Sequence, residues 1–313
     1  MNEGRTGGRS RAGILANLED ADFLISERAL IIDAQMIAAG PKLRLIQRIG
    51  RLTHDIDLAE AGRRNLPVSY APVLRCAKVA EHAMMQILML QRNYRLLEHT
   101  VRTISDQKPR RCDANTFAYN WANIESVGSL IGATVGIVGF GEIAAELALR
   151  LRPFGCRVLY NKRTPLPARS ESLFGIEYSS LDDIRSQSDI IVILLPHSQN
   201  TEGSVDGAFL RGLKPGAKLV ATGASTVLNE NAAAEAYLEG RIAGMATDGW
   251  NYEPIEPGNN LVALADDPAA NVAFTPHVAA GSGTIDWPER RAEYENVVRL
   301  LNGLPLINVV SDL

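Results

Sequence analysis

The sequence predicts an α/β fold with a doubly wound, mostly parallel sheet, and three observations support that prediction. Short apolar runs alternate with segments of helical periodicity along most of the chain. Near its middle, the glycine turn Gly139-Phe140-Gly141 joins an apolar run to a helical segment. The 313 residues, 46% of them apolar, are enough to build the cores of two domains of common size.

The N-terminal region is expected to form an α/β unit. Apolar runs at Ala21 to Ile25 and Leu43 to Ile49 flank a helical stretch around Ala29 to Ala38, which stops at Gly40-Pro41. The segment Lys78 to Leu97 contains neither Gly nor Pro and has apolar residues at helical spacing. This segment is therefore predicted to be one long helix.

A complete β-α-β unit is predicted around the glycine turn. It consists of a strand at Thr134 to Val138, a helix at Ile143 to Arg152 and a strand at Arg157 to Tyr160. The alternation then continues with strands at Ile190 to Leu195, Lys218 to Ala221, Gly244 to Thr247 and Asn271 to Phe274, and a helix at Glu230 to Glu239. A final helix, Glu289 to Leu301, and an apolar tail, Leu304 to Val310, are expected to return to the first domain.

Composition favours a small-molecule substrate over a macromolecular partner. The net charge of −4 gives no electrostatic reason to expect nucleic acid or an anionic membrane. The apolar runs are shorter than the roughly 20 residues that cross a bilayer, and the polar start, Met1 to Arg11, lacks the apolar core of a secretory signal. Because Cys76, Cys112 and Cys156 form no paired pattern, we expect a reducing, cytoplasmic location and no metal site.

The glycine turn is expected to bind a dinucleotide. Its glycines permit a tight turn and a close approach to a pyrophosphate at the positive end of the following helix. Ala144 stands at the third glycine position of the pattern, where a small residue lets helix and strand pack closely. The alternative is a plain strand-to-helix turn.

The segment Asn161-Lys162-Arg163-Thr164 follows the next predicted strand. An NAD-specific fold usually places a carboxylate there to bind the ribose 2′-hydroxyl. This chain instead has two cations and two neutral hydrogen-bonding side chains, which favours NADP, with NAD still possible. The alternative is a solvent-exposed basic turn.

His277 and Glu253 are candidates for proton transfer. His277 follows a predicted strand in Thr275-Pro276-His277, and Glu253 lies in Asp248-Gly249-Trp250-Asn251-Tyr252-Glu253-Pro254. A carboxylate can hold a histidine in one tautomer. From the residues alone, a packed or surface histidine and an exposed loop acid remain equally open.

Five motifs in this order resemble the D-isomer-specific 2-hydroxyacid dehydrogenase family, over roughly Lys42 to Val309. They are Val79-Ala80-Glu81-His82, the glycine turn, Leu213-Lys214-Pro215-Gly216-Ala217, Asp248 with Glu253-Pro254, and Thr275-Pro276-His277. The resemblance implies a Rossmann cofactor domain, residues 98–282, inserted into a smaller flavodoxin-like substrate domain, residues 1–97 and 283–313. It also implies a homodimer.

The resemblance assigns roles to individual positions. His277 and Glu253 match the family's acid–base pair, and Asp248 matches an aspartate that contacts the nicotinamide end of the cofactor. Glu81 and His82 lie in a helix that is interpreted as structural. The expected cofactor-binding residues are Gly139, Phe140, Gly141, Glu142, Ile143, Asn161, Lys162, Arg163, Thr164, Leu195, Pro196, Thr201, Thr222, Gly223, Ala224 and Asp248.

Two motifs depart from the family pattern. Ala224, in Ala221-Thr222-Gly223-Ala224-Ser225, occupies the position of the arginine that grips the substrate carboxylate. Losing such a charge-assisted contact typically costs about 1.5 to 3 kcal/mol. The substrate loop, Gly50 to Asp57, has Leu52 for a glycine and His54 for an aspartate.

A first strand and helix that the resemblance implies for the flavodoxin-like domain are also expected to be missing or degenerate.

The expected substrate-binding residues are Arg51, Leu52, Thr53 and Arg75, with Arg51 as the replacement for the missing cation and Arg75 in the loop before the long helix. The sequence thus predicts an oxidoreductase that transfers a hydride between NADP(H) or NAD(H) and a small 2-hydroxy or 2-oxo acid. Two alternatives stay open because of Ala224. One is an oxidoreductase for a different carbonyl compound or alcohol, and the other is a cofactor-binding sensor or scaffold with little catalysis.

Overall fold

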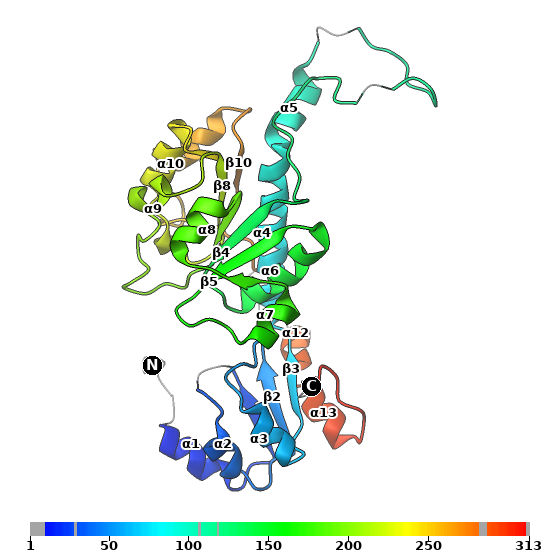
Figure 1. Cartoon of the computed structure of the whole chain (residues 1–313), viewed down its shortest axis with the longest axis vertical. Helices are drawn as coiled ribbons and strands as arrows, with labels where there is room; N and C mark the ends of the chain where they lie inside the picture. The colour runs from blue at the N-terminus through cyan, green and yellow to red at the C-terminus, as the bar shows by residue number, and fades with distance from the viewer. Residues whose placement is uncertain (1–9, 28–29, 106–107, 118, 282–286, 311–313) are drawn as a thin grey trace. The chain divides into compact units, whose positions relative to one another are not determined.

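The computed structural model describes residues 10–27, 30–105, 108–117, 119–281 and 287–310. Most of the polar start, the first residue of the helical stretch expected at Ala29 and the predicted domain boundary at 282/283 lie outside the described residues. Contacts divide the chain into two compact units, Met1–Ala77 with Ser282–Leu313, and Lys78–Gly281 (Figure 1). The sequence had placed the first boundary after Leu97, whereas the contacts group the long helix from Lys78 with the second unit.

The smaller unit contains a three-stranded parallel sheet. Its strands are β1 (Phe23–Ser26), β2 (Leu45–Ile49) and β3 (Val68–Ala71), in that order across the sheet. Sequence reasoning missed β3, which is short and has a polar Ser69 at its centre. The C-terminal tail returns to this sheet as predicted, because the Val310 amide donates to Val68 O over 2.8 Å.

The helices of the smaller unit are α1 (Arg11–Leu18), α2 (Ala34–Ala38), α3 (Leu58–Arg63), α12 (Trp287–Ala292) and α13 (Glu295–Leu301). Of these helices, the sequence patterns predicted α2 and the C-terminal helix as longer segments and missed α1 and α3. Helix α2 begins only after Asp33, whose carboxylate accepts the Met36 amide over 2.9 Å and caps the first turn. The predicted single C-terminal helix is two helices, separated at Glu293-Tyr294.

The larger unit is built on a seven-stranded sheet in the order β10-β9-β8-β7-β4-β5-β6, and every pair in it is parallel. This confirms the doubly wound α/β fold that the sequence predicted. Sequence reasoning missed only the two-residue edge strand, β6. The strands are β4 (Thr134–Val138), β5 (Arg157–Asn161), β6 (Glu177–Tyr178), β7 (Ile190–Ile193), β8 (Ala217–Ala221), β9 (Ile242–Thr247) and β10 (Val272–Phe274).

Helices cover both faces of this sheet (Figure 1). Right-handed crossovers place α6 (Glu142–Leu151) and α7 (Ala168–Phe174) on one face. The same rule places α8 (Leu181–Gln187), α9 (Gly207–Arg211) and α10 (Glu230–Leu238) on the other. Short helical turns follow at α11 (Asn260–Ala263) and in the 3₁₀ segments η1 (Arg152–Phe154), η2 (Ser225–Val227) and η3 (Leu264–Asp266).

The long helix predicted from Lys78 to Leu97 is two helices, α4 (Leu74–Arg92) and α5 (Tyr94–Thr103). Asn93 separates them with a left-handed backbone, φ 49°, which ends the α-helical path. Because α4 begins at Leu74, Arg75 lies in its first turn and not in a loop before it. Among the described residues, no helix combines the length and the apolar character that a membrane crossing needs.

Candidate active site

The loops that carry the predicted catalytic and cofactor-binding residues follow the carboxyl ends of neighbouring parallel strands in the larger unit. The strand order reverses at β4, which has β5 on one side and β7 on the other. Ligands of open α/β sheets bind in the crevice at such a switch point, outside the carboxyl ends of the strands. The glycine turn comes directly after β4, so it occupies this position.

The glycine turn has the geometry of a pyrophosphate cradle. Gly139 has φ 91°, and a Cβ there would lie 2.8 Å from Leu194 O, so only glycine fits. Gly141 precedes the first residue of α6, and no atom lies within 4 Å of where its Cβ would be. No side chain caps the start of α6, so its first amides are not used by a capping side chain. The residues of this turn fit a dinucleotide cofactor.

The segment after β5 carries positive charge and no carboxylate. Asn161 ends β5 and donates from Nδ2 to Ser179 O over 2.8 Å, while its carbonyl accepts the Gly139 amide. Lys162 is half-buried, and Arg163 and Thr164 are exposed. The basic segment is thus tied to the glycine turn through Asn161.

The loops after β7 and β8 contact each other. The Ala224 amide donates to Leu195 O over 3.1 Å, and a Cβ on Gly223 would lie 2.9 Å from the same oxygen. Thr201 Oγ1 donates to Pro196 O over 2.6 Å, which closes the β7 loop on itself. Thr222 is buried and its hydroxyl donates to Gln86 Oε1 over 2.9 Å. These contacts hold the backbone of both loops in place.

His277 and Glu253 form a hydrogen-bonded pair. His277 Nδ1 lies 2.7 Å from Oε2 and 2.8 Å from Oε1 of Glu253, and the Trp250 amide donates to Oε1 over 3.0 Å. Partial burial raises the pKa of Glu253, but the hydrogen bonds from His277 and Trp250 outweigh it and leave the pKa below its ordinary value. The side chain of His277 is 58% exposed, and Nδ1 is the ring nitrogen that bonds Glu253.

The backbone of His277 is held in an unusual conformation. Its φ is 54°, in the left-handed region that costs an ordinary residue about 1–2 kcal/mol. The His277 amide donates to Asp248 O over 2.7 Å, and the Asp248 carboxylate accepts the amides of Val278 and Ala279. Asp248 therefore fixes the loop after β10 and with it the direction of the imidazole.

Helix α4 contributes two residues whose proximity to these loops the sequence alone did not indicate. His82 Nε2 lies 2.9 Å from Thr275 Oγ1, and Gln86, fully buried, joins Thr222 to Ala273 O. His82 was interpreted as structural from the sequence, which did not predict its contact with Thr275. A signal was present: polar residues four apart lie within an otherwise apolar helical stripe.

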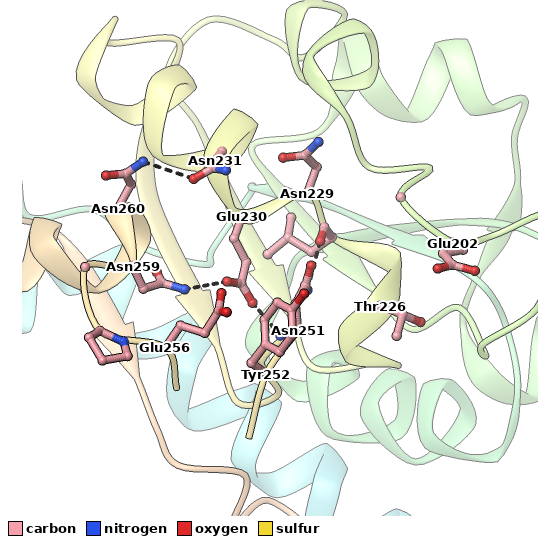
Figure 2. A pocket seen from close by; sticks show the side chains of 14 residues that line it. Glu202, Thr226, Asn229, Glu230, Asn231, Asn251, Tyr252, Glu256, Asn259 and Asn260 are labelled. Carbon is pink, nitrogen blue, oxygen red and sulfur yellow. Dashed lines mark hydrogen bonds between the residues drawn. The ribbon is translucent and has the colours of Figure 1, made fainter. Parts of the chain in front are cut away.

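A surface pocket of about 730 Å³ adjoins the loop that carries Glu253 (Figure 2). Asn251 and Tyr252 line it, together with acid and amide side chains of α10 and the 256–260 segment. Glu230 accepts the Asn251 amide and the Asn259 side-chain amide, each over 2.6 Å. These two bonds anchor both ends of the 251–259 loop, and in this way they help to position Glu253 within it.

The predicted substrate-binding residues belong to the smaller unit. The guanidinium of Arg51 lies over the ring of Tyr70, 5.6 Å from its centroid, and reaches the Tyr70 hydroxyl at 3.4 Å. Leu52 is 1% exposed, so its side chain is part of the core in a position where the family pattern has glycine. Thr53 is half-buried and Arg75 is exposed.

Comparisons with known proteins agree with this architecture. The model of the D-isomer specific 2-hydroxyacid dehydrogenase NAD binding domain matches residues 79–279. Glyoxylate reductase of Thermococcus kodakarensis is 32% identical over 296 residues, covering 94% of this chain and 84% of that protein. The solved structure of a Granulicella formate dehydrogenase is 26% identical with a TM-score of 0.57, covering 95% of this chain and 76% of that one.

A further relative, D-3-phosphoglycerate dehydrogenase of Mycobacterium leprae, is 30% identical over 279 residues, or 88% of this chain and 48% of that protein. The chain therefore spans about half the length of the phosphoglycerate dehydrogenases it matches. Since the family model covers nearly all of the larger unit and the reductase matches along most of the chain, this protein belongs to the D-isomer-specific 2-hydroxyacid dehydrogenase family of nicotinamide-dependent oxidoreductases.

Proposed function

We propose that this protein is an NADP(H)-preferring reductase or dehydrogenase of small 2-oxo or 2-hydroxy acids, with His277 as its acid/base. The observation that carries the proposal is the His277–Glu253 pair, 2.7 Å apart at the carboxyl edge of the sheet. Relatives named glyoxylate reductase support a short 2-oxo acid as the substrate class.

In the direction of reduction, protonated His277 donates from Nε2 to the carbonyl oxygen of the substrate. Glu253 accepts from Nδ1, which keeps the proton-donating nitrogen directed outward and stabilises the imidazolium. A nicotinamide cofactor would supply the hydride when bound. Asp248 holds the loop that carries His277. In the reverse direction His277 takes the hydroxyl proton.

The preference for NADP rests on the residues after β5. Lys162 and Arg163 provide cations, Asn161 and Thr164 provide hydrogen-bonding groups, and no carboxylate is present among these four to repel a 2′-phosphate. In Rossmann folds that use NADP, an arginine near this position accommodates the 2′-phosphate.

Ala224 removes the arginine that would grip a substrate carboxylate, and we propose that Arg51 supplies this charge. Arg51 is held over the Tyr70 ring, which pre-orders the long side chain. The small Ala224 side chain also favours a second candidate, a reductase for carbonyl compounds that lack a carboxylate. A panel containing both substrate types separates the two.

The test measures NADPH and NADH binding by calorimetry, then oxidation of each with glyoxylate, longer 2-oxo acids and matched uncharged aldehydes and ketones. We expect turnover with 2-oxo acids, and in His277→Ala a loss of kcat of about 10²- to 10⁴-fold with unchanged cofactor Kd. His99→Ala, on α5, is the control and should keep full activity. Cofactor binding with no turnover of any substrate would instead favour a sensor or scaffold.

We also propose a homodimer that uses α5 and the segment after it. No residue of α5 is buried, and Val101 is 71% exposed. Phe117, Tyr119 and Trp121 are exposed as well. A second copy covering this apolar surface explains why it is retained. Light scattering should give twice the chain mass, and Val101→Asp should shift the protein towards monomer; a monomeric wild type at micromolar concentration contradicts the proposal.

A further inference from the structure

We propose that His82 and Thr275 are positioning residues, which set the direction of His277 through the carboxylate of Asp248. This inference rests on the proposed role of His277 and adds to it a chain of hydrogen bonds that starts on α4. The four residues come from α4, the loop after β9 and the loop after β10.

The direction of each hydrogen bond follows from donor chemistry. Thr275 Oγ1 lies 2.6 Å from Asp248 Oδ1, and a carboxylate can only accept, so the threonine hydroxyl donates to it. The hydroxyl has given up its single proton and therefore accepts from His82 Nε2, 2.9 Å away. The hydrogen bonds thus run from His82 through Thr275 to Asp248 and require a proton on Nε2 of His82, which also lies 3.5 Å from Asp248 Oδ1.

Asp248 transmits this constraint to His277. Its Oδ1 also accepts the Val278 amide over 3.0 Å, its Oδ2 accepts the Ala279 amide over 2.8 Å, and its backbone carbonyl accepts the His277 amide over 2.7 Å. Three consecutive amides therefore end on one residue. A left-handed backbone at a non-glycine residue persists only where its surroundings impose it, and Asp248 supplies that constraint.

Burial makes this series of hydrogen bonds sensitive to the loss of any one of its residues. The side chains of His82 and Asp248 are 12% and 4% exposed, so a missing hydrogen bond is not replaced easily by water. The side chain of His277 itself is 58% exposed, so its direction depends on hydrogen bonds such as that to Glu253. If the Asp248 carboxylate rotated, it would lose its hydrogen bonds to the Val278 and Ala279 amides and so release the loop that orients the imidazole.

The kinetic test compares Thr275→Val, which keeps the shape but removes the hydroxyl, with Thr275→Ser, which keeps the hydroxyl. With the best 2-oxo acid of the panel, we expect Thr275→Val to lower kcat by about tenfold to a hundredfold. Thr275→Ser should restore most of kcat. His82→Phe should have a similar effect, and the double variant with Thr275→Val should add little because both break one chain.

A second measurement does not depend on turnover. The chain has five histidines, so ring ¹⁵N signals of the full-length protein can be assigned with His277→Asn. We expect wild type and Thr275→Ser to show His277 as a single species with Nδ1 protonated, and Thr275→Val to show exchange between tautomers. Gln91→Leu, which removes a hydrogen bond from α4 to Ser129 O, is the control for general destabilisation.

The inference is overturned if Thr275→Val lowers only the melting temperature, as Gln91→Leu should, and keeps the wild-type kcat and His277 signals. If wild type reduces no 2-oxo acid, the proposed function fails. In that case the ring signals alone still decide whether Thr275 positions His277.

Discussion

The imidazole of His277 donates from Nδ1 to the carboxylate of Glu253, with 2.7 Å between Nδ1 and Oε2. Both residues lie in loops at the carboxyl edge of the sheet, 24 positions apart in the sequence. The loop of Glu253 is held by Glu230, and the loop of His277 is held by Asp248. The pair is therefore pre-formed by the protein itself, as acid–base chemistry requires.

Glu253→Gln should remove the charge that stabilises the imidazolium and lower kcat by about tenfold to a hundredfold. The Glu253 pKa lies below 4.5 in the folded protein, so its contribution to stability is fully present above that pH and disappears as the pH falls through the folded-state pKa. Melting temperatures of wild type and Glu253→Gln should therefore differ at neutral pH and converge in acid. A difference that stays constant with pH would contradict this assignment.

Gly139→Ala should destabilise the larger unit and abolish cofactor binding. Its positive φ costs an alanine about 1–2 kcal/mol, and the new Cβ would also meet Leu194 O at 2.8 Å. Gly132→Ala is the matched control, because Gly132 has φ 74° but no atom within 4 Å of the new Cβ. Urea unfolding should show a larger loss for Gly139→Ala; equal losses would mean that the close approach carries no cost.

Lys162→Ala with Arg163→Ala should weaken NADPH binding and leave NADH binding nearly unchanged. Loss of a charge-assisted contact to the 2′-phosphate corresponds to about a tenfold to hundredfold rise in Kd. Arg211→Ala, on α9, is the control for a lost surface cation. Calorimetry of both cofactors checks this, and an equal weakening for NADPH and NADH would argue against 2′-phosphate recognition.

Arg51→Ala should lower kcat/KM for 2-oxo acids by about tenfold or more, since the substrate carboxylate loses its charge-assisted hydrogen bond. Uncharged carbonyl substrates should be unaffected. Arg44→Ala offers a close comparison, because Arg44 also lies over an aromatic ring, that of Phe23, in the same unit. Unchanged kcat/KM for acids in Arg51→Ala would remove Arg51 from substrate binding.

Much of the fold of the larger unit could be predicted because its strands are buried on both faces and appear as short apolar runs. The glycine turn indicated β4 and α6 for a different reason: at position 139, only glycine fits the backbone conformation and the close contact with Leu194 O. Strands with weaker patterns were missed, among them β3, which has a polar residue at its centre, and the two-residue β6. Asn93 ended the long helix through its backbone conformation, which no apolar spacing reveals.

By itself, the sequence determined the strand–turn–helix unit and singled out Ala224, His277 and Glu253 as candidate site residues, since each depends on local chemistry or on the order of motifs. Only the tertiary structure decided which other side chains position these residues through hydrogen bonds. The contact from His82 to Thr275 spans 193 positions, and Leu52 is in the core because of how the chain packs around it. Such relationships depend on the path of the whole chain, which a local pattern of residues does not contain.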